Sequence, residues 1–262
     1  MGVLRSESRT EQVAMKQLRM FMNMSDSHRN KGKNLFRREA QIWSRFKHRF
    51  ILEFLGFAML DGNRFFLISP WVGKGNAMQY LEENPEHDRT RLTSQIADAL
   101  NYLHSGGSGT SYVHGDLKGD NVLISDEGNA LLCDFGLTRH VEKVASMTAT
   151  PSGLSTLGHI RFSAPELFTS GRPTTHSDVF AFGCLVIQIF TGHLPYDHLE
   201  MDIQVLYAVA AGELPHRPSS PAVVRAGLDD RLWALVMRCF IREPSMRIKM
   251  SEIFEVLSIG EA

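Results

Sequence analysis

The sequence contains little cysteine, and this excludes several classes of protein. Only three cysteines, Cys133, Cys184 and Cys239, occur among 262 residues, and each of them lies in an apolar run. Such cysteines are typical of small buried side chains in a reducing compartment, and they lack the spaced pairing of a disulfide framework or a zinc site. The composition therefore predicts a cytoplasmic location, or a nuclear one.

The chain also has neither a large charge of one sign nor a long hydrophobic run. Its formal net charge is -1, which gives no electrostatic reason to expect nucleic acid or an anionic membrane as a partner. The longest apolar run, Val179–Phe190, is shorter than the roughly 18 residues that a membrane span needs, and it contains Gln188. Gly2 fits a loose myristoylation pattern, but we interpret it as part of a strand. We expect no membrane span.

The most informative stretch is a polar run at residues 112–121, YVHGDLKGDN, between apolar residues. It carries Asp116, Lys118 and Asn121, and a second carboxylate, Asp134, follows within the sequence CDFG. The pattern predicts a polar loop that is held between apolar anchors. Two carboxylates and an amide can bind a divalent metal and orient a hydroxyl group, and phosphoryl transfer needs both of these.

A lysine and a glutamate upstream strengthen this interpretation. Residues 12–18 alternate apolar and polar side chains around Lys16, which predicts a strand. Residues 21–33 are polar and predict a loop, and residues 35–46 then have the apolar period of a helix that carries Glu39. Taken alone, Lys16 is equally typical of a surface lysine on an edge strand, and Glu39 of one of several solvated charges.

The remaining pattern predicts few strands and many helices. Asp61–Asn63 has the composition of a hairpin turn, and residues 64–69 form its returning strand. Residues 137–158 are rich in Ser and Thr and predict a mobile polar loop. We expect helices at residues 76–83, 88–103, 177–189, 199–212, 228–240 and 250–257. Residues 215–221 are rich in proline and predict a loop.

These motifs, in this order, resemble the eukaryotic protein kinase family. VAMK resembles its V-A-I-K motif, YVHGDLKGDN its H-R-D-L-x-x-x-N loop, CDFG its D-F-G and HIRFSAPE its A-P-E segment. SDVFAFGCL and REPSMR resemble the tyrosine-kinase-like branch, with the catalytic loop in its serine/threonine form. The HGDLKGxN variant resembles kinase-like proteins that are frequent in mushroom-forming fungi.

The resemblance implies an α+β, bilobal protein-kinase fold. A small β-sheet lobe with one helix would span residues 1–72, and a larger, mainly α-helical lobe would span residues 73–262. The helical lobe would carry the catalytic loop and the activation segment. We expect the small sheet to be truncated, because no G-x-G-x-x-G-x-V segment precedes Lys16 and Gly2 resembles the end of the second strand.

The resemblance also implies an activity and residues for it. The γ-phosphoryl group of ATP would be transferred to serine or threonine hydroxyls of a protein substrate. Asp116 would orient the hydroxyl and accept its proton, and Lys118 would neutralise the phosphoryl group in transfer. Asn121 and Asp134 would hold Mg²⁺. The pattern assigns no oligomeric state.

A second group of residues would bind ATP itself. Lys16, with Glu39 as its counter-ion, would position the α- and β-phosphates. Pro70 and Val72 would form the hinge that bonds to the adenine, and Leu123 would contact the nucleotide from the strand after the catalytic loop.

Further residues would support the site. Asp178 would bond to the backbone of the catalytic loop, Arg247 would pair with Glu166, and Ser69 would be a small gatekeeper. Apolar packing between the lobes would involve Trp43, His114 and Phe135.

Two departures leave alternatives open. Gly115 stands where the family has an arginine that receives a phosphorylated loop residue, so we expect activation by loop phosphorylation to be weak or absent. The missing glycine-rich segment removes phosphate ligands and a lid. The chain is therefore either a serine/threonine kinase or a pseudokinase that retains the fold for scaffolding. A phosphotransferase for small molecules fits less well, because the A-P-E segment and SDVFAFG are present.

Overall fold

The computed structural model describes residues 2–5, 10–17, 26–60, 64–107, 109–136, 138–140 and 160–259. Its strands are β1 (Gly2–Arg5), β2 (Thr10–Gln17), β3 (Gly56–Leu60), β4 (Arg64–Pro70), β5 (Tyr112–Val113), β6 (Val122–Ile124), β7 (Ala130–Leu132) and β8 (Arg139–His140). Its helices are α1 (Asp26–Trp43), α2 (Ala77–Glu83), α3 (Arg89–Ser105), α5 (Leu167–Ser170), α6 (Thr175–Thr191), α7 (Asp202–Ala211), α8 (Pro221–Arg225), α9 (Asp230–Cys239) and α10 (Met250–Ser258). Single 3-10 turns occur at Gly119–Asn121 and Pro244–Met246.

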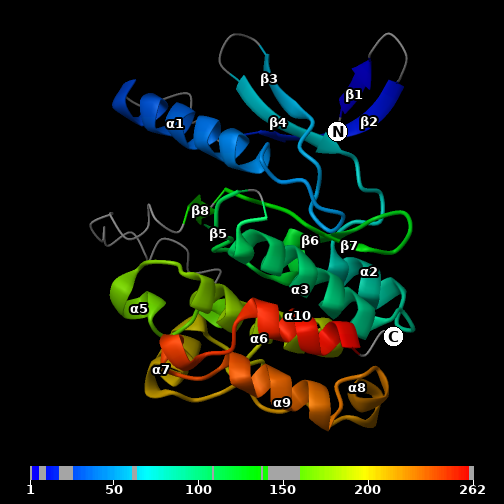
Figure 1. The fold of residues 1–262 in the computed structure, drawn as a ribbon, viewed down its shortest axis with the longest axis vertical. Helices are drawn as coiled ribbons and strands as arrows, with labels where there is room; N and C mark the ends of the chain where they lie inside the picture. The colour runs from blue at the N-terminus through cyan, green and yellow to red at the C-terminus, as the bar shows by residue number, and fades with distance from the viewer. Residues whose placement is uncertain are drawn as a thin grey trace.

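One end of the molecule is a four-stranded antiparallel sheet with α1 beside it, and the other end is helical (Figure 1). The strand order is β1-β2-β4-β3, and Lys16 lies opposite Leu67 in the register. Helix α1 packs on β3 and β4 through Phe36, whose ring centroid lies 5.9 Å from that of Phe57 and 5.2 Å from that of Phe65. The α+β architecture that we predicted is thus confirmed.

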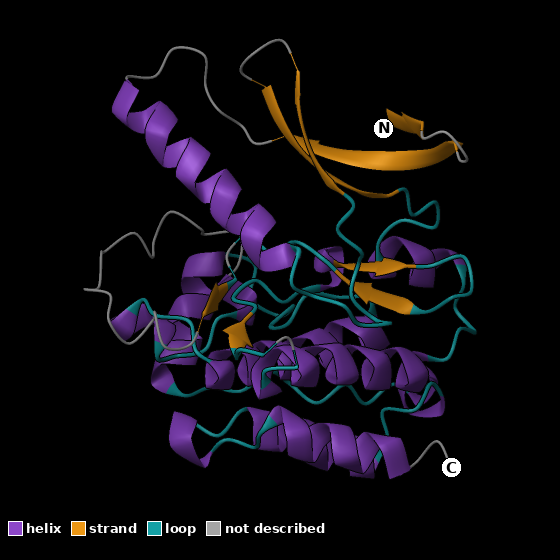
Figure 2. Cartoon of the chain, turned by 45° about the horizontal axis from the view of Figure 1, so that its top comes forward, coloured by secondary structure: helices purple, strands orange, loops and turns teal. Residues whose placement is uncertain are grey.

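Helix α1 begins earlier than the sequence predicted. The prediction placed a loop at residues 21–33, and the structure has helix from Asp26 onward and ends it at Trp43. The prediction was wrong because residues 26–34 are polar and carry no apolar period, which a helix requires only where it packs. Figure 2 shows this end of α1 reaching beyond the edge of the sheet.

The helical end forms around α6, in which nearly every side chain is buried. A capping box of Thr174 and Ser177 begins this helix, and Gly192 in the left-handed region ends it. Helix α3 packs beside α6 and begins as predicted, because Asp88 accepts a hydrogen bond from the backbone N–H of Arg91. Figure 2 shows the helices layered beneath the sheet.

Two short elements lie within or next to predicted loops, and the sequence analysis predicted neither of them. Helix α8 follows the proline-rich stretch, because Ser220 caps its first turn and Pro221 occupies the first helical position, where proline has no hydrogen bond to lose. Strand β8 pairs with β5 at the start of the polar loop. The rest of that loop, residues 141–159, and the hairpin turn at 61–63 lie outside the described residues.

The core runs from the last turns of α1 through the polar run at residues 112–121 into α3, α6 and α9. All three cysteines are buried within it as free thiols. Burial raises the pKa of the Cys133 thiol to about 12. Among the helices that the structure describes, none has the length and hydrophobicity of a membrane span.

Candidate active site

The polar run at 112–121 is held from below by one buried carboxylate. Asp178, at the start of α6, accepts hydrogen bonds from the backbone N–H of His114 at 2.7 Å and of Gly115 at 2.9 Å. Its side chain is only 2% exposed, so these bonds form away from water, where a carboxylate needs such partners. The predicted contact between Asp178 and this backbone is confirmed, and it fixes the path of the loop ahead of Asp116.

Four further residues hold the loop, and sequence reasoning missed their roles. They are Arg38, His104, Thr138 and Gln188. His104 Nε2 lies 2.9 Å from the carboxylate of Asp178, and the Gln188 side-chain oxygen accepts from the backbone N–H of Gly119 at 3.0 Å. One signal was available: Gln188 is a polar residue in an otherwise apolar helix, and buried amides need hydrogen-bond partners.

Thr138 and Arg38 connect the loop to α1. The Thr138 hydroxyl donates to the carbonyl oxygen of His114 at 3.2 Å, and the Arg38 guanidinium donates to the carbonyl oxygen of Thr138 at 2.6 Å. These contacts join residues that are far apart in the sequence, so no local pattern could have indicated them. They link the helix that carries Glu39 to the polar loop.

Asp116, Lys118 and Asn121 form the first charged group. The Asn121 side-chain nitrogen donates to the carboxylate of Asp116 at 2.8 Å and to its backbone oxygen at 2.7 Å. Lys118 Nζ lies 3.6 Å from the same carboxylate. Because the amide nitrogen of Asn121 faces Asp116, its oxygen is directed elsewhere. The Asp116 carboxylate is therefore fixed in orientation beside a cation, although neither side chain is fully buried.

Lys16, Glu39 and Asp134 form the second charged group. Lys16 Nζ lies 2.9 Å from the carboxylate of Glu39 and 2.6 Å from that of Asp134. Burial lowers the pKa of Lys16, but the two carboxylates outweigh this and the pKa is raised above its usual value. The sequence predicted the Lys16–Glu39 pair, and the structure adds Asp134. The lysine thus joins strand β2, helix α1 and the segment after β7.

The backbone at Asp134 is in an unusual conformation. Its φ of 65° lies in the left-handed region, which non-glycine residues seldom adopt and which is frequent at functional sites. The backbone N–H of Gly136 donates to Asp134 Oδ1 at 3.3 Å. A β-carbon on Gly136 would lie 3.3 Å from carboxylate oxygens of both Asp134 and Glu39, so glycine fits this position best.

An aromatic cluster joins the two ends of the molecule, as predicted. The ring of Phe135 lies 5.7 Å from that of Trp43, 5.0 Å from that of Phe46 and 5.5 Å from that of His114, measured between centroids. His114 donates through Nε2 to the carbonyl oxygen of Cys133 and accepts at Nδ1 from the N–H of Asp116, which sets its tautomer. Packing therefore couples α1 to both charged groups.

Three residues were expected to contact the adenine. Pro70 and Val72 lie where β4 leads toward α2, and Leu123 lies on β6. Pro70 pairs with Val13 at the end of β4, and Val72 is half-buried against the main core. Leu123 packs against the same core and forms an isolated bridge with Asn76, and the N–H of Ile124 donates to the carbonyl oxygen of Gly75 at 3.0 Å. The linking segment and β6 are therefore adjacent. Ser69 is buried.

The site has the donors that a nucleotide and a divalent cation need. Asp134 and Asn121 offer carboxylate and amide oxygens, which are the hard ligands of Mg²⁺. Lys16 and Lys118 offer cations for phosphate oxygens. Gly115, with a φ of 79°, adds no side chain to this set. The arrangement can hold a polyphosphate and present a fixed carboxylate to a hydroxyl group.

Comparison with known proteins finds similar protein kinases. The family model described as protein tyrosine and serine/threonine kinase matches residues 1–257. The chain is similar to the serine/threonine-protein kinase TNNI3K of Mus musculus, with 26% identity over 262 aligned residues, 97% of this chain and 29% of that protein. It is similar to the serine/threonine/tyrosine-protein kinase HT1 of Arabidopsis thaliana, with 30% identity over 250 residues, 94% of this chain and 59% of that protein.

A third relative is the receptor-like kinase TMK4 of Arabidopsis thaliana, with 29% identity over 246 residues, 87% of this chain and 26% of that protein. The chain thus spans between 26% and 59% of the length of these three relatives.

Proposed function

The chain belongs to the protein tyrosine and serine/threonine kinase family, and from this premise we propose that it transfers the γ-phosphoryl group of ATP to serine and threonine hydroxyls of protein substrates. A protein kinase domain implies ATP, a divalent metal and a protein substrate. The observation that carries the proposal is the orientation of the Asp116 carboxylate by Asn121, at 2.8 Å, in a chain that also forms the Lys16–Glu39 pair.

Asp116 acts on the substrate hydroxyl. Its carboxylate is fixed by Asn121, so it can accept a hydrogen bond from the hydroxyl and aim the oxygen at the phosphoryl group. Lys118 lies 3.6 Å from this carboxylate and can neutralise charge on the phosphoryl oxygens during transfer. Phosphoryl transfer needs mainly positioning and charge neutralisation, and these two residues supply both.

Lys16 and Glu39 position the α- and β-phosphates. The ammonium group stays charged because its pKa is raised, and Glu39 holds it on the side of α1. Lys16 also contacts Asp134 at 2.6 Å, and phosphate oxygens would compete for this ammonium group.

Asn121 and Asp134 are the proposed ligands of Mg²⁺, because their side chains offer hard oxygen donors. A metal ion held by these residues would supply neutralisation of the phosphate charge. Asn121 has a double task in this proposal, since its amide nitrogen holds Asp116 and its oxygen remains for the metal.

Pro70, Val72 and Leu123 are the proposed adenine contacts. Proline has no backbone N–H, so Pro70 can only accept through its carbonyl oxygen, and Val72 would supply the donor. We place the boundary between the two lobes here, with residues 1–72 in one and 73–262 in the other.

The preference for serine and threonine rests on Lys118. The catalytic loop reads D-L-K-x-x-N, and we infer the serine/threonine class from that form. One relative is named a serine/threonine-protein kinase, and another is named a serine/threonine/tyrosine-protein kinase.

A pseudokinase is the alternative, and one observation favours it. Gly115 stands where the family has an arginine that receives a phosphorylated loop residue. This difference concerns activation, and it removes no residue that is assigned to the chemical step.

A transfer assay decides between these functions. The purified chain is incubated with Mg²⁺, radiolabelled ATP and a peptide mixture that contains serine, threonine and tyrosine, and the phosphoamino acids are identified. We expect phosphoserine and phosphothreonine with the natural sequence, and none with Asp134→Asn. Label at the level of Asp134→Asn would support the pseudokinase, and phosphotyrosine alone would contradict the proposed specificity.

A further inference from the structure

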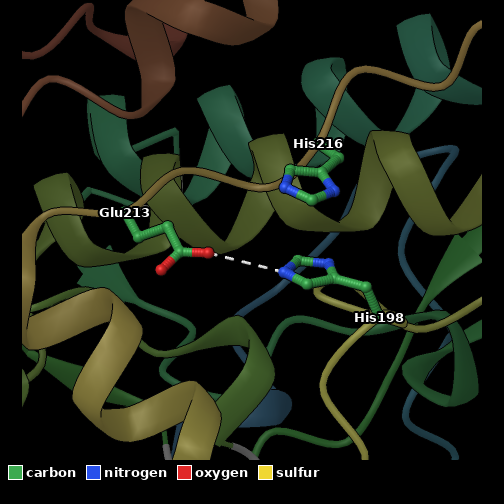
Figure 3. A group of neighbouring side chains, drawn as sticks. All are labelled: His198, Glu213 and His216. Carbon is green, nitrogen blue, oxygen red and sulfur yellow. Dashed lines mark hydrogen bonds and ion pairs between the residues drawn. The ribbon is translucent and has the colours of Figure 1, made fainter.

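Two histidines and a glutamate converge on the surface of the helical end, far from the catalytic loop in sequence. His198 lies in the segment between α6 and α7, and Glu213 and His216 lie in the segment after α7. One ligand atom from each of the three side chains lies within 4.8 Å of the others. Figure 3 shows the Glu213 carboxylate facing the two imidazole rings, which come from different segments. All three residues are exposed, so ions in solution can reach them.

The distances within the cluster are compatible with a shared metal ion. His198 Nε2 lies 3.4 Å from Glu213 Oε1, and two ligand atoms that are each ~2.0–2.1 Å from a tetrahedral zinc ion lie about 3.4 Å apart. The rings of His198 and His216 are stacked, with 3.9 Å between centroids and 10° between planes. Because an imidazole binds a metal ion in the plane of its own ring, one of these two rings would have to turn about its Cβ–Cγ bond for both to bind the same ion.

The backbone beneath the cluster is fixed before any ligand binds. Tyr196 is 2% exposed, and its hydroxyl donates to the backbone oxygen of Glu213 at 3.1 Å, which ties the two segments together. Tyr196 also has a φ of 59°, in the region that non-glycine residues seldom adopt. The tie holds His198, two residues further on, within reach of Glu213.

Arg161 fixes the same segment from the other side. Its guanidinium donates to the backbone oxygens of Tyr196 at 2.9 Å and Leu199 at 2.8 Å, and it pairs with Asp202 at 2.9 Å. These bonds enclose His198 between two anchored residues. A site whose backbone is already ordered loses less entropy when a ligand binds.

Two arginines lie near the cluster, and each has partners of its own. The guanidinium of Arg242, beside Gly212, donates to the backbone oxygen of Ala210 at 3.0 Å. Arg217, next to His216, is paired with Asp230 and lies over the ring of Trp233 at 5.8 Å. Its charge is therefore directed away from the imidazoles. Glu213 brings a negative charge into the cluster itself.

From these observations we propose that His198, Glu213 and His216 form a binding site for Zn²⁺. Imidazole and carboxylate together suit zinc, whereas Mg²⁺ and Ca²⁺ prefer sites made of oxygen alone. Three protein ligands leave a fourth position for water. Zinc at this site joins the segment before α7 to the segment after it, and so reinforces the contact that Tyr196 makes.

Titration calorimetry with zinc sulfate tests the proposal on the full chain. We expect the natural sequence to bind a first zinc ion more tightly than any further zinc ion. The His198→Ala and His216→Ala variants should bind this first ion at least tenfold more weakly. Glu213→Gln keeps the shape of the side chain, and we expect it to weaken binding as well. His193→Ala is the matched control, since His193 is an exposed histidine of the same segment outside the cluster.

Two further measurements use other signals. Co²⁺ in place of zinc should give the visible absorption of a nitrogen- and oxygen-ligated site, and His216→Ala should abolish it. In hydrogen exchange, zinc should slow the amides of residues 196–201, 212–214, 216 and 217 in the natural sequence, but not in His198→Ala. Equal zinc affinity in the natural sequence and in the two alanine variants, or no binding at all, would overturn the proposal. Binding that His193→Ala weakens as much would also overturn it.

Discussion

Arg247 and Glu166 form a two-point ion pair although they are 81 positions apart, with N–O distances of 2.8 and 3.1 Å. The Arg247 side chain is fully buried, and its guanidinium also donates to the backbone oxygens of Ile241 and His176. The pair joins the A-P-E segment to the turn before α10. Because the guanidinium has no water to replace these partners, its contacts act together to hold the two segments.

Replacing Arg247 by methionine should lower the free energy of unfolding by about 3–5 kcal/mol, because removal of the buried guanidinium leaves a partly buried carboxylate and two carbonyl groups without their donor. Urea denaturation measures this change. The matched control is Arg238→Met, whose ion pair with Glu252 is half-exposed and should contribute less than about 1 kcal/mol. Equal losses in the two variants would contradict the assignment.

Lys16→Met should reduce the rate of phosphoryl transfer by at least about 100-fold, because the ammonium group is the proposed ligand of the phosphates. Its partner Glu39 is only 6% exposed, so loss of the lysine leaves a buried carboxylate unpaired and should also lower the free energy of unfolding. Transfer kinetics and thermal unfolding measure the two effects. Lys47→Met is the control, because Lys47 is an exposed lysine in the segment that follows α1. Transfer that survives in Lys16→Met would remove this lysine from the mechanism.

Much of the fold was predictable from the sequence, because local signals and motif order agreed. Asp88 marked the start of α3, and the apolar run around Gln188 marked α6 as a buried helix. The Lys16–Glu39 and Arg247–Glu166 pairs were predicted from a family resemblance, and the distances confirm both. The roles of the catalytic, nucleotide-binding and metal-binding residues stay predictions.

The remainder was not predictable, because it depends on contacts between distant segments. The contact between Lys16 and Asp134 joins residues 118 positions apart, and no periodic pattern in the sequence indicates it. The first turns of α1 are polar and so gave no apolar pattern. The cluster of His198, Glu213 and His216 combines two loops that a hydrogen bond from Tyr196 to the backbone of Glu213 ties together.

His48 should titrate below its usual pKa of 6.5, because burial disfavours the charged ring, even though Asp98 opposes this. Its Nδ1 accepts a hydrogen bond from the N–H of Phe50, which protonation at that nitrogen would break. As the pH falls, His48 of the unfolded chain therefore binds a proton before His48 of the folded chain does. The contribution of the neutral ring to the free energy of unfolding is present above about pH 6.5, and it is lost as the pH falls through the pKa of the folded state.

NMR titration of the His48 ring measures this pKa. In Asp98→Asn the pKa should fall further, because the carboxylate that favours the imidazolium is gone and the charge of Arg49 remains. A His48 pKa above 6.5, or a rise in Asp98→Asn, would contradict this interpretation.

Gly115→Ala should lower the free energy of unfolding by about 1–2 kcal/mol, because its φ of 79° costs an L-residue this much. Chemical denaturation measures the change. Gly73→Ala is the matched control: a β-carbon on Gly73 would meet its nearest neighbour only at 3.9 Å, without a positive φ. If both variants lose the same stability, the left-handed backbone is not the reason for glycine at position 115.

The central claim is that Asp116 serves a chemical step, and the single-turnover rate of phosphoryl transfer at saturating ATP and Mg²⁺ tests it most directly. Asp116→Asn should slow this rate by about 10²–10⁴-fold, which is the usual contribution of a general base, while ATP binding is retained. Asp126→Asn, the same change at an exposed turn, should leave the rate unchanged. Equal single-turnover rates for the natural sequence and Asp116→Asn would contradict the claim.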